Sequence, residues 1–143
     1  MPSALVDTGV WYALFDPRDR ADDRENVEAL AELLEAMTVV VPWPVTYETI
    51  RTRFARNVGA MAAFERQLRS PRTVFLEDAA YREDALNHCF DSSLRMRRPL
   101  SLLDSLLRVI ISDPNTRVDY LATYNDADFH DVCAVRRVEL LPG

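Results

Sequence analysis

Short apolar runs alternate along the chain with longer amphipathic stretches, a pattern that predicts strands and helices in turn. The apolar runs predict strands at 4–6, 38–41, 73–76, 120–123 and 138–141. Helical spacing of apolar residues predicts helices at 10–15, 22–37, 44–58, 60–69, 78–94 and 100–112. Strands that alternate with helices favour a parallel sheet covered on both faces. We therefore expect an α/β fold, a three-layer α/β/α sandwich with a mostly parallel central sheet of four to five strands, in a single domain over residues 1–143.

The segment after Pro44 is expected to form one helix that ends at Gly59. Its apolar residues share one stripe: Tyr47, Ile50, Phe54 and Val58. Because one face of a sheet cannot easily cover this helix and the next, part of the stripe is expected to face a second copy of the chain. A homodimer would also place two basic faces side by side.

The composition is that of one globular domain, with 143 residues of which 48% are hydrophobic. The longest apolar run, at 37–43, is far shorter than the ~20 residues that a membrane-spanning helix needs. No charged segment precedes Ala4, so we expect no secretory signal and a cytoplasmic location.

All 17 basic residues are arginine, and the chain contains no lysine. Phosphate-binding P-loops and Schiff-base enzymes need a lysine, as do most receiver domains and haloacid-dehalogenase-type phosphatases, so these classes are disfavoured. Cys89, Cys133, His88 and His130 follow no zinc-site spacing, and we expect the cysteines to be reduced thiols.

The formal net charge is -6, but the charges are polarised along the chain. Residues 16–35 hold 8 acids and 3 arginines, a net of -5, whereas residues 51–72 hold 6 arginines and 1 acid, a net of +5. Such a chain can bind a polyanion on one face, and its acidic total can reflect carboxylates gathered around a metal ion.

Acidic residues follow two of the predicted strands. Asp7 comes after the first strand, and Asp126 and Asp128 come after the fourth. Because ligands of open parallel sheets bind beyond the carboxyl ends of the strands, these acids are candidates for one shared site. The alternative for Asp7 is the N-cap of the next helix, although Thr8 could serve as that cap instead.

Two further acids lie on predicted helices. Asp104 shares an apolar stripe with Leu107, where a carboxylate is costly unless it is paired or bound to a metal. The alternative is a helix N-cap or a buried arginine partner. Glu48 is expected in the first turn of its helix, where the helix dipole, or a pair with Arg51, would also favour it.

Together these residues suggest a metal site made of oxygen ligands. Carboxylates crowded at one sheet edge resist ionising together, and a hard divalent cation removes that penalty. Oxygen-only ligands select Mg²⁺ or Mn²⁺, which activates water and neutralises charge on a phosphodiester.

The acids lie in four segments that resemble, in order, the motifs of PIN-domain proteins. The segments are Val6-Asp7-Thr8-Gly9-Val10-Trp11-Tyr12-Ala13-Leu14, Val45-Thr46-Tyr47-Glu48-Thr49, Leu102-Leu103-Asp104-Ser105-Leu106-Leu107 and Leu121-Ala122-Thr123-Tyr124-Asn125-Asp126-Ala127-Asp128-Phe129. The chain length is similar to that of stand-alone VapC-type toxins. The resemblance implies a Mg²⁺- or Mn²⁺-dependent endoribonuclease, usually homodimeric, that a small antitoxin protein holds inactive.

The resemblance also implies roles for the acids. Asp7 and Asp104 would bind the metal directly, and Glu48 with either Asp126 or Asp128 would complete the site, through water or as the base. Activated water would attack the phosphorus in line and leave a 5′-phosphate and a 3′-hydroxyl. Asn125 stands where many members carry an acid, so the choice between Asp126 and Asp128 stays open.

Substrate and partner contacts complete these expectations. Small polar residues beside the acids, Thr8, Thr123 and Asn125, are expected to contact RNA. A set of arginines, Arg51, Arg53, Arg56, Arg66, Arg69 and Arg72, is expected to hold its backbone, unless it is only a solvated helix face. The antitoxin is expected near Trp11, Tyr12 and Phe15, unless these aromatics belong to the core. Two other functions are compatible with the pattern: a non-catalytic PIN-like module that binds RNA or protein, and a phosphatase or other metal hydrolase.

Overall fold

Five parallel strands form the centre of the chain in the computed structural model, which describes residues 1–142. The strands are β1 (Ser3–Val6), β2 (Thr38–Pro42), β3 (Thr73–Leu76), β4 (Tyr120–Ala122) and β5 (Glu139–Leu141). Their order across the sheet is β3-β2-β1-β4-β5, and every neighbouring pair is parallel. The predicted α/β class is confirmed, with all five strands parallel.

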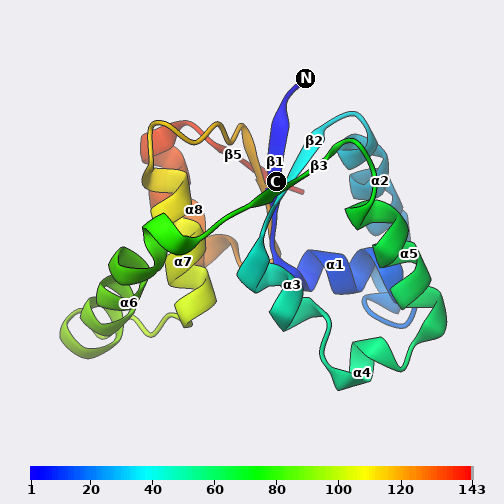
Figure 1. Cartoon of the computed structure of the whole chain (residues 1–143), viewed down its shortest axis with the longest axis horizontal. Coiled ribbons are helices and arrows are strands. Elements are labelled where there is room, and N and C mark those ends of the chain that lie inside the picture. The colour runs from blue at the N-terminus through cyan, green and yellow to red at the C-terminus, as the bar shows by residue number, and fades with distance from the viewer. Residues whose placement is uncertain (143) are drawn as a thin grey trace.

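Helices cover both faces of this sheet. They are α1 (Thr8–Phe15), α2 (Arg24–Glu35), α3 (Trp43–Thr49), α4 (Thr52–Ala55), α5 (Val58–Leu68), α6 (Arg82–Phe90), α7 (Leu102–Ser112) and α8 (Asp126–Arg136). In Figure 1, α6, α7 and α8 gather on one side of the sheet, and α1, α2 and α5 gather on the other. The chain changes faces between β3 and β4, so β1 and β4 are neighbours that lead into helices on opposite faces. This is a topological switch point, where ligands of open α/β sheets bind.

The register of the two central strands decides what meets at that point. Leu5 pairs with Leu121 and Val6 with Ala122, and all four are fully buried. Buried parallel strands are apolar on both faces, which is why these short runs were recognisable in the sequence. The register places the residues that follow, Asp7 and Thr123, side by side at the carboxyl edge of the sheet.

The prediction of one helix at 44–58 is wrong, because this segment forms two helices, α3 and α4, and its last residue, Val58, begins α5. The chain leaves helical geometry at Ile50, and Asn57 caps α5 by accepting a hydrogen bond from the amide of Ala60 at 3.1 Å. Gly59 therefore lies in the first turn of α5 and ends no helix. The predicted apolar stripe is therefore not one continuous face. Tyr47 is 77% exposed, whereas Phe54 is buried.

Phe54 is buried against its own chain. Its ring centroid lies 5.6 Å from that of Tyr12 and 5.7 Å from that of Phe64. Trp11 is also enclosed, with ring contacts at 5.7 Å to Phe15 and 5.3 Å to Phe64. Trp11, Tyr12 and Phe15 were expected either to contact the antitoxin or to belong to the core. The burial of Trp11 confirms the core for this residue.

Other helix bounds differ from the pattern in smaller ways. The predicted helix at 22–37 begins with a 3₁₀ turn, η1 (Ala21–Asp23). The predicted helix at 78–94 consists of a 3₁₀ turn, η2 (Ala79–Tyr81), then α6 and a π-helical turn, η3 (Asp91–Arg95). Helix α8 was not predicted, although Phe129, Val132 and Cys133 recur at helical spacing and are buried. None of the helices in residues 1–142 is long and apolar enough to cross a membrane.

Candidate active site

Asp7 is the most enclosed acid at the switch point, with 6% of its surface exposed. One carboxylate oxygen accepts a hydrogen bond from the hydroxyl of Thr123 at 3.0 Å, and the other accepts from the amide of Thr8 at 2.8 Å. Asp7 is the N-cap of α1, so the alternative with Thr8 as the cap is wrong. Burial raises the pKa of Asp7 above its usual value, the two hydrogen bonds oppose this, and the charge of Asp128 adds to it.

Asp104 lies half-buried in the first turn of α7. The N-cap of that helix is Ser101, whose hydroxyl accepts from the amide of Asp104 at 3.0 Å, so the alternative with Asp104 as the cap is wrong. The pKa of Asp104 is raised to about 6, chiefly by burial and next by the charge of Asp7; the hydrogen bond with Ser101 opposes this, and the charges of Asp128 and Glu48 add smaller effects. Charges from three other elements therefore converge on this carboxylate.

The two candidates for the fourth acid differ in their surroundings. Asp128 is half-buried, and its charge raises the pKa of both Asp7 and Asp104. Asp126 is exposed, and its charge acts instead on Cys133. Two residues along a helix differ in direction by about 200°, so only one of these acids can face the others. The charge of Asp128, and not that of Asp126, is therefore the one that acts on Asp7 and Asp104.

Glu48 lies in the last turn of α3, and the expectation of a first-turn position is wrong. The dipole of a helix disfavours an acid at this end, so it does not explain why a glutamate stands here. The main-chain carbonyl of Glu48 accepts a hydrogen bond from the hydroxyl of Tyr12 at 2.9 Å, which ties α3 to α1. Glu48 thereby comes close enough to Asp104 to act on its pKa.

The chemistry of these donors fits a hard divalent cation, because Asp7, Asp104, Asp128 and Glu48 offer only carboxylate oxygens. Within residues 1–142, however, no three or more His, Cys, Asp or Glu side chains form a group arranged to hold a metal ion. The acids approach one another without forming a closed set of ligands. Cys133 is buried, and burial raises the pKa of its thiol to about 11, which disfavours a thiolate ligand.

The three small polar residues expected to contact RNA lie at different depths. The hydroxyl of Thr8 is buried and finds no hydrogen-bond partner within residues 1–142. The hydroxyl of Thr123 donates to Asp7 and accepts from the amide of Asn125 at 3.0 Å. Asn125 alone is exposed. Thr123 therefore acts on Asp7 in this structure, and Asn125 is the one of the three that lies at the surface.

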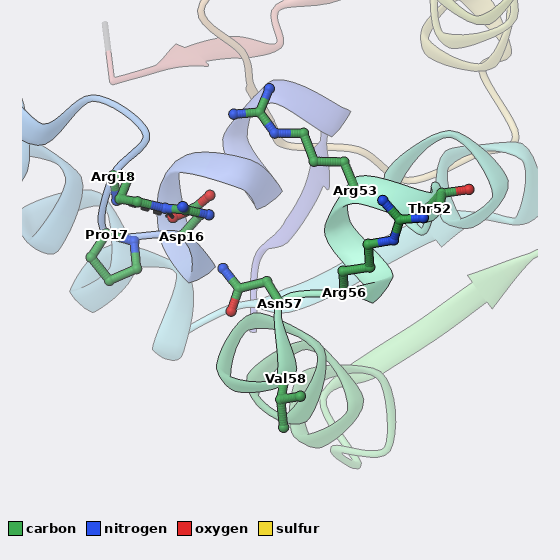
Figure 2. Close-up of a pocket in the computed structure, with 8 residues that line it drawn as sticks. All are labelled: Asp16, Pro17, Arg18, Thr52, Arg53, Arg56, Asn57 and Val58. Atoms are coloured by element: carbon green, nitrogen blue, oxygen red, sulfur yellow. Dashed lines mark hydrogen bonds and ion pairs between the residues drawn. The ribbon is translucent and has the colours of Figure 1, made fainter.

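An arginine-lined cleft lies between the end of α1 and α4. Its larger cavity, of about 850 Å³, is lined by Asp16, Pro17, Arg18, Thr52, Arg53, Arg56, Asn57 and Val58. Figure 2 shows Arg18 and Asp16 on one wall, and Arg53 and Arg56 on the other. Arg18 was not among the predicted contacts, because it lies in the acidic part of the sequence, where Asp16 pairs with it at 3.3 Å.

A second cavity, of about 340 Å³, continues this cleft. It shares Asp16, Arg18, Arg53 and Asn57 with the first and adds Tyr12, Asp19, Arg51 and Phe54. The hydroxyl of Tyr12, which lines this cavity, donates to the Glu48 carbonyl, whereas Asp7, Glu48, Asp104 and Asp128 line neither cavity. We call the residues of both cavities together the arginine cleft.

The remaining predicted arginines lie outside the arginine cleft. Arg72 donates to the carbonyls of Leu34 and Met37 at 3.0 and 3.1 Å, and Arg69 pairs with Glu65 at 3.2 Å. The cleft thus contains Arg51, Arg53 and Arg56 from the predicted set.

No protein-family model matches the chain, and no curated protein or solved structure matches it either. The resemblance to PIN-domain proteins therefore stays a prediction from the four motifs.

Proposed function

We propose that this chain is a Mg²⁺- or Mn²⁺-dependent endoribonuclease that acts as the toxin of a toxin–antitoxin pair. One observation carries the proposal: a buried Asp7 at the switch point, held by Thr123, within electrostatic reach of Asp104 and Asp128. In open parallel sheets this is the place where ligands bind. A buried carboxyl group whose pKa is raised further by a neighbouring charge, as for Asp7 and Asp104, is a recognised mark of such sites.

Each residue of the proposed site would have its own role. Asp7 and Asp104 would hold the ion, and Asp128 and Glu48 would complete its surroundings. A bound Mg²⁺ or Mn²⁺ supplies charge neutralisation at the phosphodiester and lowers the pKa of a water. Thr123 keeps the Asp7 carboxylate in one orientation through its hydrogen bond. The products would carry a 5′-phosphate and a 3′-hydroxyl.

The arginine cleft supports RNA as the substrate. It presents Arg18, Arg51, Arg53 and Arg56 together, although the whole chain has a net charge of -6. Contacts between arginine and phosphate give affinity that does not depend on base sequence. We propose that the RNA backbone follows this cleft towards Asp104.

The decisive experiment compares cleavage of single-stranded RNA by the purified chain and by Asp104→Asn. We expect cleavage with millimolar Mg²⁺ or Mn²⁺, no cleavage with chelator, and none by the variant. Asp113→Asn, at the other end of α7, is the matched control and should cleave normally. Faster hydrolysis of a small phosphate monoester than of RNA would point instead to a phosphatase or other metal hydrolase.

A second candidate function is a non-catalytic module that binds RNA or protein. It is favoured by one observation, that the carboxylates within residues 1–142 are not gathered into a ready metal-holding group. This module would bind RNA through the arginine cleft, would leave it intact with every divalent ion, and would bind equally well after Asp104→Asn.

The proposal includes a small antitoxin partner, a homodimer and a cytoplasmic location. Because Trp11 is buried, we propose that the antitoxin contacts exposed apolar residues next to the acids, Tyr47 and Leu102. Co-expression with a short upstream reading frame should suppress cleavage. Light scattering should give about twice the chain mass of 16.4 kDa.

A further inference from the structure

A buried arginine joins the helix of Asp104 to the helix of Asp128. Arg108 lies one turn after Asp104 on α7, and only 9% of it is exposed. Its two terminal nitrogens donate to the two carboxylate oxygens of Asp131, at 2.7 and 2.8 Å. One of them also donates to the main-chain carbonyl of Asp128 at 2.8 Å. The remaining nitrogen, Nε, donates to Nε2 of His88 at 3.0 Å.

A second arginine reaches the same part of α8 from the loop before α7. Arg98 donates to the carbonyl of Ala127 at 2.9 Å and to the carboxylate of Asp131 at 3.2 and 3.4 Å. Its own backbone is fixed by Ser92, which exchanges two hydrogen bonds with it at 2.5 and 2.8 Å. Two guanidinium groups thus hold consecutive carbonyls, those of Ala127 and Asp128, in the first turn of α8.

This turn needs support that the helix itself does not provide. Asn125, the N-cap residue of α8, makes no side-chain capping hydrogen bond. The charge of Asp128 meanwhile acts on Asp7 and Asp104, and like charges repel one another. Bidentate pairs between arginine and carboxylate are the most directional ion pairs in proteins, so the Arg108–Asp131 pair can resist that repulsion.

We propose that Arg108, Asp131 and Arg98 are positioning residues that hold Asp128 against Asp104 for divalent-cation binding. The inference rests on the proposed metal-dependent function and adds residues that the four motifs do not contain. None of the three is expected to touch the ion or the RNA. They act through the backbone of α8, as groups behind metal ligands do elsewhere.

The test is the Mn²⁺ dependence of Asp131→Asn, measured by thermal unfolding and by RNA cleavage. Loss of a group that supports a metal ligand costs 10- to 100-fold in metal affinity, so the Mn²⁺ concentration for half-maximal thermal stabilisation should rise about tenfold. Saturating Mn²⁺ should restore the cleavage rate to within about twofold, because the ligands themselves remain. A variant that is only destabilised should instead melt at a lower temperature at every Mn²⁺ concentration and keep the wild-type midpoint. Asp113→Asn is the matched control and should keep the wild-type Mn²⁺ midpoint.

The outcomes separate the two proposals. A folded Asp131→Asn with the wild-type Mn²⁺ midpoint overturns the positioning role and leaves the nuclease proposal intact. If Asp131→Asn does not fold, Arg98→Gln replaces it, because this change keeps the Arg108–Asp131 pair and removes the contact with Ala127. It should raise the midpoint about threefold, and an unchanged midpoint overturns the inference. A wild-type chain that responds to Mn²⁺ in neither assay overturns both proposals.

Discussion

The hydroxyl of Thr123 donates a hydrogen bond to a carboxylate oxygen of Asp7, 116 residues earlier in the chain, at 3.0 Å. Both residues directly follow parallel strands that are neighbours in the sheet, and both are buried. The contact joins the two sides of the switch point and orients the most enclosed acid of the candidate site.

Thr123→Val should therefore destabilise the fold and weaken metal binding. Valine keeps the shape of threonine but leaves a buried carboxylate oxygen without its donor, which costs about 1 to 3 kcal/mol in the free energy of unfolding. Urea unfolding measures this cost, and the Mn²⁺ midpoint of thermal stabilisation measures the effect on the site. Thr73→Val is the control, because the partly buried Thr73 hydroxyl bonds to the Gln67 carbonyl at the start of the edge strand β3, away from the acids. Equal Mn²⁺ midpoints in the two variants would contradict a role for Thr123 at the site.

Asp104→Asn should abolish RNA cleavage without unfolding the chain. The amide removes a charge on which Asp7, Asp128 and Glu48 converge, so stability without metal should stay level or increase. A loss of about a thousandfold in rate corresponds to about 4 kcal/mol of transition-state stabilisation, within the range of metal catalysis. Cleavage assays and thermal unfolding of the same preparation measure both effects. Wild-type cleavage by this variant would remove Asp104 from the proposed site.

The stability of the chain should depend on pH through the same carboxyl group. The pKa of Asp104 is raised from 3.8 to about 6, chiefly by burial. The folded state therefore keeps a proton that the unfolded state releases, so this stabilising contribution is complete below about pH 4 and is lost as the pH rises through 6. Because Asp104 is half-exposed and screened by solvent, the loss should be only about 1 kcal/mol. The measurement is urea unfolding of wild type and Asp104→Asn at several pH values. A difference between the two that does not change from pH 4 to 7 would contradict the raised pKa.

Asp128→Asn and Asp126→Asn form a matched pair two residues apart on α8. Asp128 acts on Asp7 and Asp104, whereas Asp126 is exposed and acts on neither. We expect Asp128→Asn to lose most Mn²⁺ stabilisation and cleavage, by about tenfold or more in metal affinity, and Asp126→Asn to change either by less than about twofold. Thermal shift and RNA cleavage over a Mn²⁺ series measure both. The reverse ranking would assign the fourth ligand to Asp126.

The arginine cleft predicts a particular salt dependence of RNA binding. Each phosphate contact that is lost should lower the slope of log affinity against log salt by about 0.7 for a single strand. Arg53→Gln and Arg56→Gln should each show this change, measured in the Asp104→Asn background so that the RNA stays intact. Arg69→Gln is the control, because Arg69 pairs with Glu65 outside the cleft. Equal slopes in all three variants would show that RNA does not follow the cleft.

Local pattern was sufficient for the elements whose burial is uniform. The apolar run before Asp7 marked β1, because a covered parallel strand is apolar on both faces. The strand at 73–76 was also predicted to the residue, although it lies at the edge of the sheet and is only partly buried. The local sequence pattern did not predict the helix ends where packing against distant side chains determines the path of the backbone. The chain bends at Ile50 and Asn57, which leaves Phe54 packed on Tyr12 and Phe64, and no spacing within the segment indicates that.

The sequence by itself determined the alternation of strands and helices, the absence of lysine chemistry and the acids that follow the central strands. These properties depend on residue type and on the spacing of hydrophobic residues, and both are visible within a short stretch of sequence. Only the tertiary structure decided that the charge of Asp128 acts on Asp104, that Thr123 holds Asp7, and that Arg108 joins α7 to α8. Charges and hydrogen bonds act through space, so their partners follow from strand register and helix packing and not from distance along the chain.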